Sequence, residues 1–546
     1  MLADPATSAV GTTATALHGA FSGSRPATPC ASRSCPAPRV KCGRRAFDRG
    51  QPRVNRGHLE CPATLPRAPA RAASNRVTRP ELLLVSTPLR AGRLPGGVCP
   101  SLSNLTLGTA VRARGRAVEV LDPTVDLDAQ HLDPKHVLAA TADAVLAARP
   151  RVVGITALSP TEGRFGAAIA RALKARAPDL PVVLGGVWAM AVPQRLLARC
   201  PEIDGIVVGP GEDGAAAIAA HGLARAAEVP GLVWRHAGEL VANPASTHPG
   251  QAAPLDLGLM RHPERYDIFC WLTSRGCPYH CAFCTERLGS PSFSADPLAK
   301  VGHDVAAFRQ LGRPWYLWIC DALFGASRQR LARVCDALDG AGLEFLAESR
   351  VDVLRPDDVP RLRAAGCNMI YFGLEAVSRR SLVALAKIED RPTRHARYVD
   401  GAGALTEACL RNDVLPVFGV LNPVPGDTAE DLAQSLTLLE ELAAIARRLG
   451  PAAHGIAPCF HAFPLRLDAG APYEQCIGDL AAAGVRWSEP PDPLFGDRYL
   501  TRASPTIGPA EGEAFRARVR ALNSPSPDVQ RRLLRSFPRP YVEFDA

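Results

Sequence analysis

The 546-residue sequence predicts an α/β protein with two successive open sheets: a Rossmann-like (flavodoxin-like) domain followed by a partial (β/α)6 TIM-type barrel. Two observations support this prediction. Short apolar, β-rich runs alternate with helix-length amphipathic runs from Glu81 to about residue 240, and a second alternation begins after residue 262. Strands that alternate with helices form a parallel sheet with helices on both faces. The length also exceeds that of one ordinary domain.

The first alternation, residues 80–240, contains five predicted strands. Two of the segments between them, residues 134–148 and 164–177, have the spacing and length of helices. A stretch rich in Pro, His, Gly and Asn then predicts a linker over residues 241–261. The strands are predicted at residues 82–86, 118–121, 152–156, 182–184 and 203–208.

The second alternation, residues 262–465, contains six β/α units, where a closed barrel would need eight. We therefore expect an open partial barrel. Helices are predicted between its strands, for example at residues 327–339 and 428–447. The mixed, Pro-rich residues 466–546 predict a small, mainly helical C-terminal cap. The barrel strands are predicted at residues 268–274, 315–320, 343–347, 369–374 and 415–421 and within 454–463.

The positive charge of the chain is concentrated at its N-terminal end. Residues 1–80 carry 13 Lys and Arg against 3 Asp and Glu, whereas the rest carries 50 basic and 51 acidic residues. The near-neutral remainder gives no reason to expect nucleic acid as a partner. Residues 1–79 are rich in Ala, Pro and Arg and poor in acidic residues, which predicts a disordered tail. A transit segment and an upstream start-codon artefact both explain this composition.

Composition also indicates the environment of the protein. Hydrophobic residues make up 47% and charged residues 21%, as in a water-soluble globular protein. No apolar run reaches the roughly 18 residues of a membrane span. The 16 cysteines are mostly scattered singly through apolar segments, which favours the reducing cytoplasm over a secreted disulfide protein.

Three closely spaced cysteines, Cys277, Cys281 and Cys284, follow directly on a predicted strand. A [4Fe-4S] cube bound by three thiolates keeps one iron open for a substrate or cofactor, whereas a structural cluster normally has four. The alternatives are a zinc site and cysteines that only pack. Zinc prefers four protein ligands at structural sites, and a loop wrapped around a metal would turn His280 outward. We assign other cysteines to packing, namely Cys320, Cys335 and Cys367.

The C-x-x-x-C-x-aromatic-C pattern, with Phe283 as the aromatic residue, resembles the signature of the radical S-adenosylmethionine (SAM) superfamily. Further segments that resemble this family fall in order along residues 262–465: L-W-I-C-D at 317–321, E-S-R at 348–350, Y-F-G-L-E at 371–375 and P-V-P-G-D-T at 423–428. The resemblance implies a [4Fe-4S] cluster on the three cysteines. It also implies SAM contacts by Phe283, Asp321, Ser349, Arg350 and Glu375.

In that family, SAM binds the open iron through its amino and carboxylate groups. One electron from the reduced cluster then breaks a carbon–sulfur bond and releases a 5′-deoxyadenosyl radical. Because such a radical abstracts hydrogen from almost any molecule, the barrel lumen must exclude water. The protein supplies placement and the cofactor supplies reactivity. No catalytic residue beyond the cluster and the SAM site is assigned.

The first domain resembles a cobalamin-binding fold. Thr156 and Leu158 match its S/T-x-L element. After 26 intervening residues, Gly185 and Gly186 match its Gly-Gly element. Small residues there let a sheet edge approach a bulky ligand closely, and a hydroxyl can bond to its nucleotide tail. An acidic, Gly-rich turn that resembles the end of this domain contains Gly209 and Glu212. An ordinary flavodoxin-like domain is the alternative.

Two positions depart from the cobalamin-binding pattern. The D-x-H-x-x-G element that coordinates cobalt from below is replaced at residues 101–109 by S-L-S-N-L-T-L-G-T, which has no histidine. The resemblance therefore implies a corrin without a His ligand, as is common in the radical SAM branch. Trp188 occupies a position that is often His in relatives.

Together the resemblances imply a cobalamin-dependent radical SAM methyltransferase. It would use two SAM molecules per turnover to methylate an unactivated carbon of a small molecule or peptide. Cyclisation, ring rearrangement or oxidation with the same cofactors is the main alternative, and a non-catalytic corrinoid or cluster carrier is another. We expect a cytoplasmic monomer that receives electrons from a donor such as flavodoxin or ferredoxin, without nucleic acid as a partner.

Overall fold

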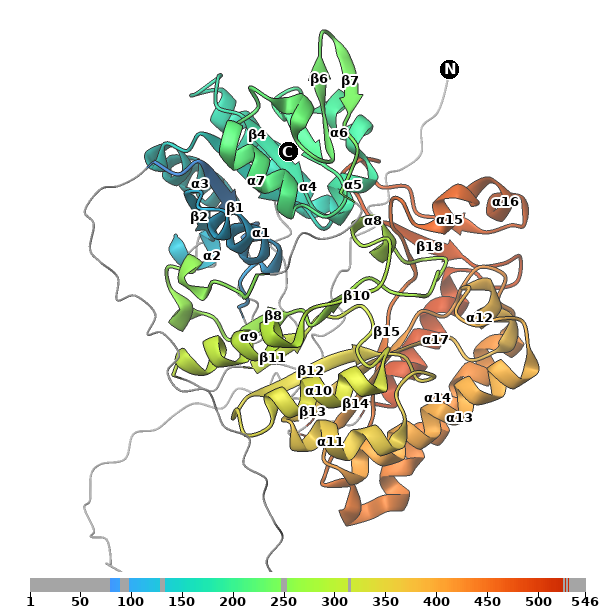
Figure 1. The fold of residues 1–546 in the computed structure, drawn as a ribbon. Coiled ribbons are helices and arrows are strands. Elements are labelled where there is room, and N and C mark those ends of the chain that lie inside the picture. Colours follow the sequence, from blue (N-terminus) through green and yellow to red (C-terminus); the bar gives the residue numbers. More distant parts are fainter. Residues whose placement is uncertain are drawn as a thin grey trace, which may run out of the picture. The chain divides into compact units, whose positions relative to one another are not determined.

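The computed structural model describes residues 79–88, 98–127, 133–246, 253–312, 316–523, 526 and 529. All of them belong to one compact unit, Arg76–Ala546. The tail predicted at residues 1–79 lies outside the described residues except for Arg79. Figure 1 shows two main sheets in succession along the chain, each flanked by helices, which confirms the predicted α/β class.

The first sheet has seven strands in the order β2-β1-β3-β4-β5-β6-β7. The five predicted strands are present and parallel. The sequence did not predict β6 and β7, which pair antiparallel at the edge. Their two-residue turn has positive φ at both Ala237 and Gly238, as in the tight turns typical of hairpins. The strands are β1 (Leu82–Val85), β2 (Val118–Leu121), β3 (Val152–Thr156), β4 (Val182–Gly185), β5 (Gly205–Val207), β6 (Leu232–His236) and β7 (Glu239–Ala242).

Helices cover both faces of this sheet. Along β1, Leu82 and Leu84 belong to one hydrophobic core, whereas Leu83 and Val85 belong to another. Successive side chains of a strand point to opposite faces, so both faces are buried. On the two faces, α1 packs against α7 and α3 packs against α4. The helices are α1 (Leu102–Ala113), α2 (Pro123–Asp126), α3 (Pro134–Ala148), α4 (Pro160–Lys174), α5 (Val187–Ala191), α6 (Pro193–Arg199) and α7 (Glu212–His221).

The second sheet confirms the predicted partial barrel. Its six strands are parallel and follow the order β15-β14-β13-β12-β11-β8, so each strand pairs with its neighbour along the chain. The strands are β8 (Ile268–Trp271), β11 (Tyr316–Ile319), β12 (Glu344–Ser349), β13 (Cys367–Glu375), β14 (Leu415–Val420) and β15 (Cys459–Ala462). The helices between them are α8 (Glu286–Gly289), α9 (Leu298–Gln310), α10 (Arg328–Leu338), α11 (Val359–Ala364), α12 (Arg379–Ala384), α13 (Pro392–Arg411) and α14 (Ala429–Leu449).

The two faces of the barrel sheet differ in character. On the outer face, Phe372 stacks on Phe418 at 5.4 Å between ring centroids, and Phe418 stacks on Phe460 at 5.9 Å. Phe269, also on this face, packs on Phe308 of α9. The inner face carries polar, partly exposed side chains such as Glu348, described below. The aromatic outer face therefore holds the helices, and the inner face lines the lumen.

The C-terminal region contains more than the predicted helices. Three short strands form an antiparallel sheet in the order β16-β18-β17. Its strands are too short to show a hydrophobic alternation in the sequence. Helices still contain more of the described residues than strands do, as predicted. The elements are β16 (Arg466–Leu467), α15 (Pro472–Gln475), α16 (Ile477–Ala482), β17 (Arg486–Trp487), β18 (Arg498–Arg502) and α17 (Pro509–Ala521).

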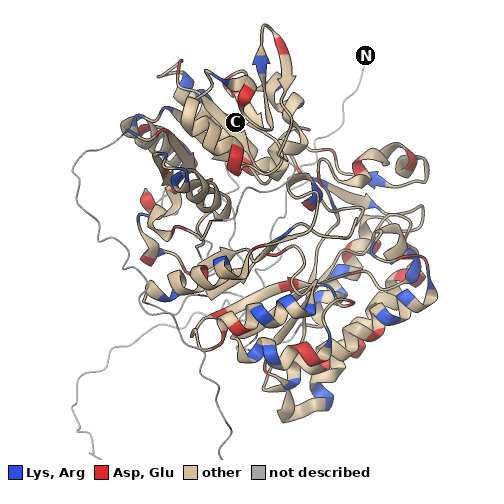
Figure 2. Cartoon of the chain, in the orientation of Figure 1, with Lys and Arg blue, Asp and Glu red and all other residues tan. Residues whose placement is uncertain are grey.

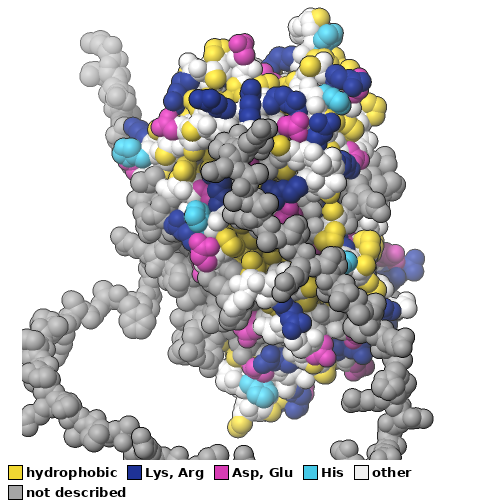
Figure 3. Space-filling model, turned by 60° about the vertical axis from the view of Figure 1, so that its left-hand side comes forward, with side chains coloured by type: hydrophobic (Ala, Val, Ile, Leu, Met, Phe, Trp, Pro, Cys, Tyr) yellow, Lys and Arg dark blue, Asp and Glu magenta, His cyan; other side chains and the backbone are white. Residues whose placement is uncertain are grey.

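Charged side chains of both signs are distributed over the described part of the chain. Lys and Arg alternate with Asp and Glu on the helices around the barrel sheet (Figure 2). On the face shown in Figure 3, basic, acidic and apolar side chains are interspersed. Among the described residues, no helix combines the length and the apolar character that crossing a membrane requires.

We expect the aromatic stack of the outer face to be a main source of barrel stability. Phe418 is completely buried between two other rings, so Phe418→Ala should lower the free energy of unfolding by about 3–5 kcal/mol. In contrast, Leu240→Ala on the exposed strand β7 should change it by less than about 0.5 kcal/mol. Urea denaturation of both variants tests this, and equal effects would contradict the assignment of the core.

Candidate functional site

The predicted cysteine motif forms a loop at the carboxyl end of β8. Before the first cysteine, β9 (Ser274–Arg275) pairs antiparallel with β10 (Ser294–Ala295). Gly276 then turns the chain with a φ of +71°, and a Cβ there would lie 2.3 Å from the carbonyl oxygen of Ser292. Only glycine fits this position. The loop therefore begins at a fixed point at the top of the barrel, where barrel enzymes place their functional residues.

The three cysteines of the motif are close to one another and form no disulfide. Burial raises the pKa of Cys277 and of Cys284, and the neighbouring thiols raise both further. Among the described residues, no three His, Cys, Asp or Glu side chains converge as the ligands of a single metal ion would. Thiolates of a four-iron cluster bind separate irons, so three unpaired thiols on one loop fit that group. His280 is exposed.

Asp321, one of the five residues expected to contact SAM, makes its observed contacts with the start of the cysteine loop. Its carboxylate accepts hydrogen bonds from the backbone N–H of Thr273 (2.6 Å) and Ser274 (3.0 Å) and from both hydroxyls (2.6 Å each). Only 1% of Asp321 is exposed. These bonds explain how a carboxylate tolerates burial. We therefore propose that Asp321 positions the loop.

Arg350 also contacts the cysteine loop. Its guanidinium lies 3.7 Å from the centroid of the Tyr279 ring, and its Nη1 lies 3.8 Å from the Sγ of Cys281. Asp352 accepts two further bonds, at 2.9 and 3.0 Å. Arg350 Nη2 also donates to the carbonyl oxygen of Lys387 at 2.6 Å. Arg350 thus joins the loop to the ends of two barrel segments. No pattern in the sequence singles out Tyr279 or Lys387.

Lys387 lies between two more of the residues expected to contact SAM, Glu375 and Phe283. Its Nζ forms an ion pair with Glu375 at 3.0 Å and lies 5.9 Å from the centroid of the Phe283 ring. Glu375 has a φ of +62°, in the left-handed region that residues with a side chain adopt uncommonly. The fifth residue, Ser349, donates its hydroxyl to the carbonyl oxygen of Phe324 at 2.7 Å. The contacts of all five with SAM remain a proposal.

Glu348 is a further functional candidate. It belongs to the E-S-R segment at residues 348–350 but was not among the residues expected to contact SAM. Glu348 of β12 is half-buried on the inner face of the barrel and accepts a 2.8 Å hydrogen bond from the Nε1 of Trp318. Tyr371 is its partner in the neighbouring strand. The alternation of Glu348 with the fully buried Ala347 was the available signal for an inward-facing carboxyl.

Four of the six predicted cobalamin residues, Thr156, Leu158, Gly185 and Gly186, lie at the carboxyl edge of the first sheet, on β3, β4 and the turns that follow them. The hydroxyl of Thr156 donates to the Oδ1 of Asn104 at 2.7 Å. Leu158 is 47% exposed, which is unusual for leucine. A Cβ at Gly185 would have only the carbonyl oxygen of Val207, at 3.9 Å, within contact distance. An exposed leucine beside an open glycine fits a bulky, largely apolar ligand.

The structure gives Gly186 a separate role. Its φ is +99°, and a Cβ there would lie 2.5 Å from the carbonyl oxygen of Ala157. The fold itself therefore requires this glycine, whereas it does not require Gly185. Trp188 follows in α5 and packs against Gly163 of α4 and against Phe495 at 5.7 Å between ring centroids. Residues 102–109 of the segment without histidine form the first part of α1.

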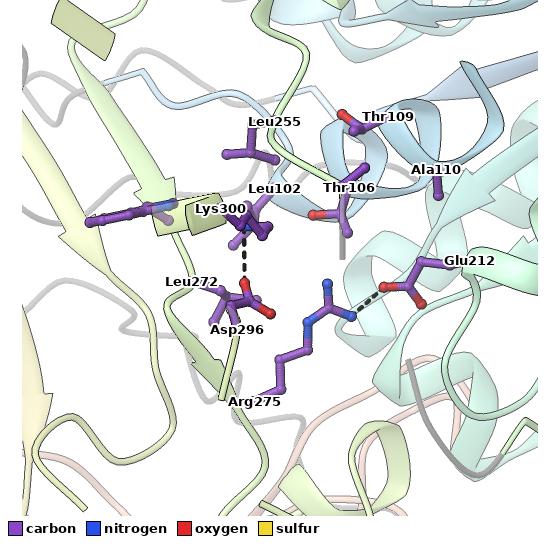
Figure 4. Close-up of a pocket in the computed structure, with 12 residues that line it drawn as sticks. Leu102, Thr106, Thr109, Ala110, Glu212, Leu255, Leu272, Arg275, Asp296 and Lys300 are labelled. Carbon is purple, nitrogen blue, oxygen red and sulfur yellow. Dashed lines mark hydrogen bonds and ion pairs between the residues drawn. The ribbon is translucent and has the colours of Figure 1, made fainter. Parts of the chain in front are cut away.

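Glu212, predicted to bind cobalamin, forms a buried ion pair with Arg275, which lies two residues before Cys277. Figure 4 shows this pair in a cavity of about 20 Å³ beside the pair Lys300–Asp296. The Arg275 and Glu212 side chains are only 14% and 7% exposed. Gly209, also expected at the ligand, has a φ of +85° and donates its N–H to the sulfur of Met190 at 3.0 Å. The acidic turn is thus linked directly to the cysteine loop.

Comparison with known families identifies both domains. Residues 92–219 match the B12 binding domain, and residues 271–439 match the Radical SAM superfamily. This chain is a radical SAM protein with a B12 binding domain. Cobalamin is the ligand of the first family, and SAM with a [4Fe-4S] cluster defines the second. The predicted family and its three cofactors are therefore confirmed.

The chain is similar to two curated proteins over about half of its length. It is 33% identical over 324 residues to 2-(S-pantetheinyl)-carbapenam-3-carboxylate methyltransferase of Streptantibioticus cattleyicolor (48% of this chain, 46% of the relative). It is 25% identical over 324 residues to anaerobic magnesium-protoporphyrin IX monomethyl ester cyclase of Rubrivivax gelatinosus (54% of each). The chain spans about half the length of the curated relatives it matches.

A solved structure has the same fold. The radical SAM methyltransferase TsrM from Kitasatospora setae, solved with tryptophan and a SAM analogue bound, superimposes with a TM-score of 0.62 at 20% identity. The match covers 82% of this chain and 89% of TsrM. The predicted order of domains, a Rossmann-like domain before a partial barrel, is thereby confirmed.

The cluster ligands can be tested by replacing each cysteine. Anaerobically reconstituted protein should bind about four iron and four sulfide, and Cys277→Ala, Cys281→Ala or Cys284→Ala should bind almost none. Cys335→Ala and Cys367→Ala, in the buried core, are matched controls that should retain iron. Iron and sulfide assays on folded protein give the result. A full cluster in all three single variants would refute the assignment.

The two neighbouring glycines should respond differently to substitution. Gly185→Leu should weaken hydroxocobalamin binding by about tenfold or more, because the side chain projects into the open space expected for the corrin. It should leave the melting temperature of cobalamin-free protein nearly unchanged. Gly186→Ala should lower that melting temperature, because its backbone conformation disfavours any side chain. Equal cobalamin affinity of wild type and Gly185→Leu would contradict the proposed site.

Proposed function

We propose that this chain is a cobalamin-dependent radical SAM methyltransferase that transfers a methyl group to an unactivated carbon of a small molecule or peptide. The observation that carries the proposal is the connection between the two domains. Arg275, at the start of the three-cysteine loop, is ion-paired with Glu212 of the B12 binding domain. In this proposal the two cofactor sites adjoin. Methyltransferases among the relatives support methyl transfer as the reaction.

The cofactors supply one-electron cleavage of SAM and methyl-group carriage when they are bound. In this proposal, Cys277, Cys281 and Cys284 hold the cluster, and Asp321 fixes the start of their loop. Arg350 and Lys387 contact the loop beside Cys281 and Phe283 and hold it against the barrel. The open side of Gly185, with Leu158 exposed nearby, holds the corrin. The barrel encloses the reacting groups in this proposal, which limits the access of water to them.

Radical cyclisation, rearrangement or oxidation with the same cofactors is the second candidate. The cyclase of Rubrivivax gelatinosus among the relatives favours it specifically. Both reactions need the same cluster loop and the same B12 binding domain. They differ in what becomes of the methyl group of SAM, so the products of SAM distinguish them.

We further propose that the protein acts as a cytoplasmic monomer without nucleic acid as a partner. Interspersed charges on the described surface agree with the last point. Reductive cleavage of SAM requires an outside electron, which a flavodoxin or ferredoxin would supply.

The first test needs no substrate. Reduced, reconstituted protein supplied with hydroxocobalamin and methyl-deuterated SAM should release S-adenosylhomocysteine, and this release should require cobalamin. An enzyme that only cyclises or oxidises would release 5′-deoxyadenosine alone. With the substrate present, the two SAM products should accumulate in a ratio near one and the product should carry the label, because each turnover uses two SAM molecules. Liquid chromatography with mass spectrometry measures all three.

The outcome also separates the two candidates cleanly. If 5′-deoxyadenosine forms without cobalamin-dependent S-adenosylhomocysteine, methyl transfer is wrong and radical SAM chemistry stands. The Gly185→Leu variant is a matched control, because it should lose chiefly S-adenosylhomocysteine formation, the step that needs the corrin.

A further inference from the structure

The inner face of the barrel carries one row of polar and aromatic side chains. Strand register places these side chains on the same face. Trp318 of β11 pairs with Leu346 of β12. Glu348 lies two residues further along β12 and pairs with Tyr371 of β13. Across the next strands, Gly373 pairs with Gly419, which pairs with His461. Residues two apart in a strand share a face. We call this set, extended by Phe463 after β15, the lumen row: Trp318, Glu348, Tyr371, His461 and Phe463.

Glu348 is the acidic member of the lumen row. Among the described residues, one hydrogen-bond donor reaches its carboxylate, the Nε1–H of Trp318. No described Lys or Arg forms an ion pair with it. Glu375, a second carboxylate at the barrel's upper end, is in contrast paired with Lys387 at 3.0 Å. A half-buried carboxyl without a cation retains capacity to accept a hydrogen bond from a ligand.

The other end of the lumen row is an aromatic surface. The rings of Tyr371 and His461 lie 6.0 Å apart between centroids, and those of His461 and Phe463 lie 5.8 Å apart. Gly419 makes room for this arrangement, since a Cβ there would lie 2.5 Å from the Oη of Tyr371. Phe463 is 49% exposed although it is a large apolar residue. Such a surface accommodates a flat, apolar group.

We propose that the lumen row is the substrate subsite, in which Glu348 accepts a hydrogen bond from an N–H or O–H of the substrate while Tyr371, His461 and Phe463 contact a planar apolar group. This inference rests on the proposed function and names its substrate class. The expected substrate contains a ring and has a hydrogen-bond donor on or beside that ring. Glu348 is then a residue that determines specificity.

The pH behaviour of the lumen row supports this role. Burial raises the pKa of Glu348 to about 7, the bond from Trp318 opposes this shift, and the charges of Glu286 and Glu375 add to it. Burial also lowers the pKa of His461 to about 4, so this ring is neutral near pH 7. Cys320 and Tyr371, which also face Glu348, have raised pKa values and stay neutral there. The fraction of ionised Glu348 therefore increases as the pH rises from 6 to 8.

A matched pair of small probes tests the proposal. Indole offers a planar ring with an N–H, and 1-methylindole offers the same ring without it. Hydrogen bonds to an ionised carboxylate are stronger than those to a neutral group. Anaerobic titration calorimetry with the reconstituted holoenzyme should therefore show indole binding about tenfold tighter than 1-methylindole at pH 8. This preference should shrink at pH 6, and 1-methylindole should show little pH dependence.

Substitutions identify the responsible carboxyl. Glu348→Gln should abolish the pH dependence of indole binding and most of its advantage over 1-methylindole. Glu344→Gln, at the exposed opposite end of the same strand, is the matched control and should behave as wild type. Phe463→Ala should weaken both probes, because it removes ring contact but no acceptor.

Three results would overturn the proposal. Equal affinity of the two probes across the pH range, an unchanged profile in Glu348→Gln, or no binding of indole at millimolar concentration would each do so. SAM cleavage by the reduced wild-type enzyme is measured in parallel. Its absence would refute the proposed function, whereas the probe titrations report on the subsite alone.

Discussion

The carboxylate of Asp321 determines where the cysteine loop starts, and the rest of the site depends on that point. It accepts four hydrogen bonds from two consecutive residues, Thr273 and Ser274, between the end of β8 and the loop. A buried carboxylate without such donors would be costly. The loop, Arg350 on the neighbouring strand and Lys387 beyond it are arranged around this start.

The order of strands and helices along the chain was predictable, because apolar and amphipathic runs alternate repeatedly in the sequence. The parallel strands of both sheets show as apolar runs, since most of their side chains are buried. The hairpin β6–β7 does not show, because β7 is largely exposed and its turn, Ala237-Gly238, lacks the usual Asn or Asp. The strands of the C-terminal sheet are two to five residues long, too short for a periodic signal.

The sequence singles out residues of the candidate site but does not predict their contacts. The motif identified the three cysteines, and the family resemblance selected Asp321 and Arg350. Neither could reveal that these two side chains bind the loop, because their partners are set by distances between strands. Glu348 was present in a quoted motif, yet its direction follows from strand register alone. Gly185 and Gly186 look alike in sequence, and only backbone geometry separates a glycine with open space beside it from one that the turn requires.

The ion pair between Arg275 and Glu212 limits how freely the two domains could have been exchanged during evolution. Both side chains are almost fully buried, and loss of either partner would leave an isolated charge at a cost of about 3–5 kcal/mol. Because Arg275 lies two residues before the first cysteine, this destabilisation would affect the loop that carries the three cysteines. A first domain acquired from another protein would need an acid at the equivalent point of α7. Recombination should therefore preserve this pair of residues more strictly than the linker that joins the domains.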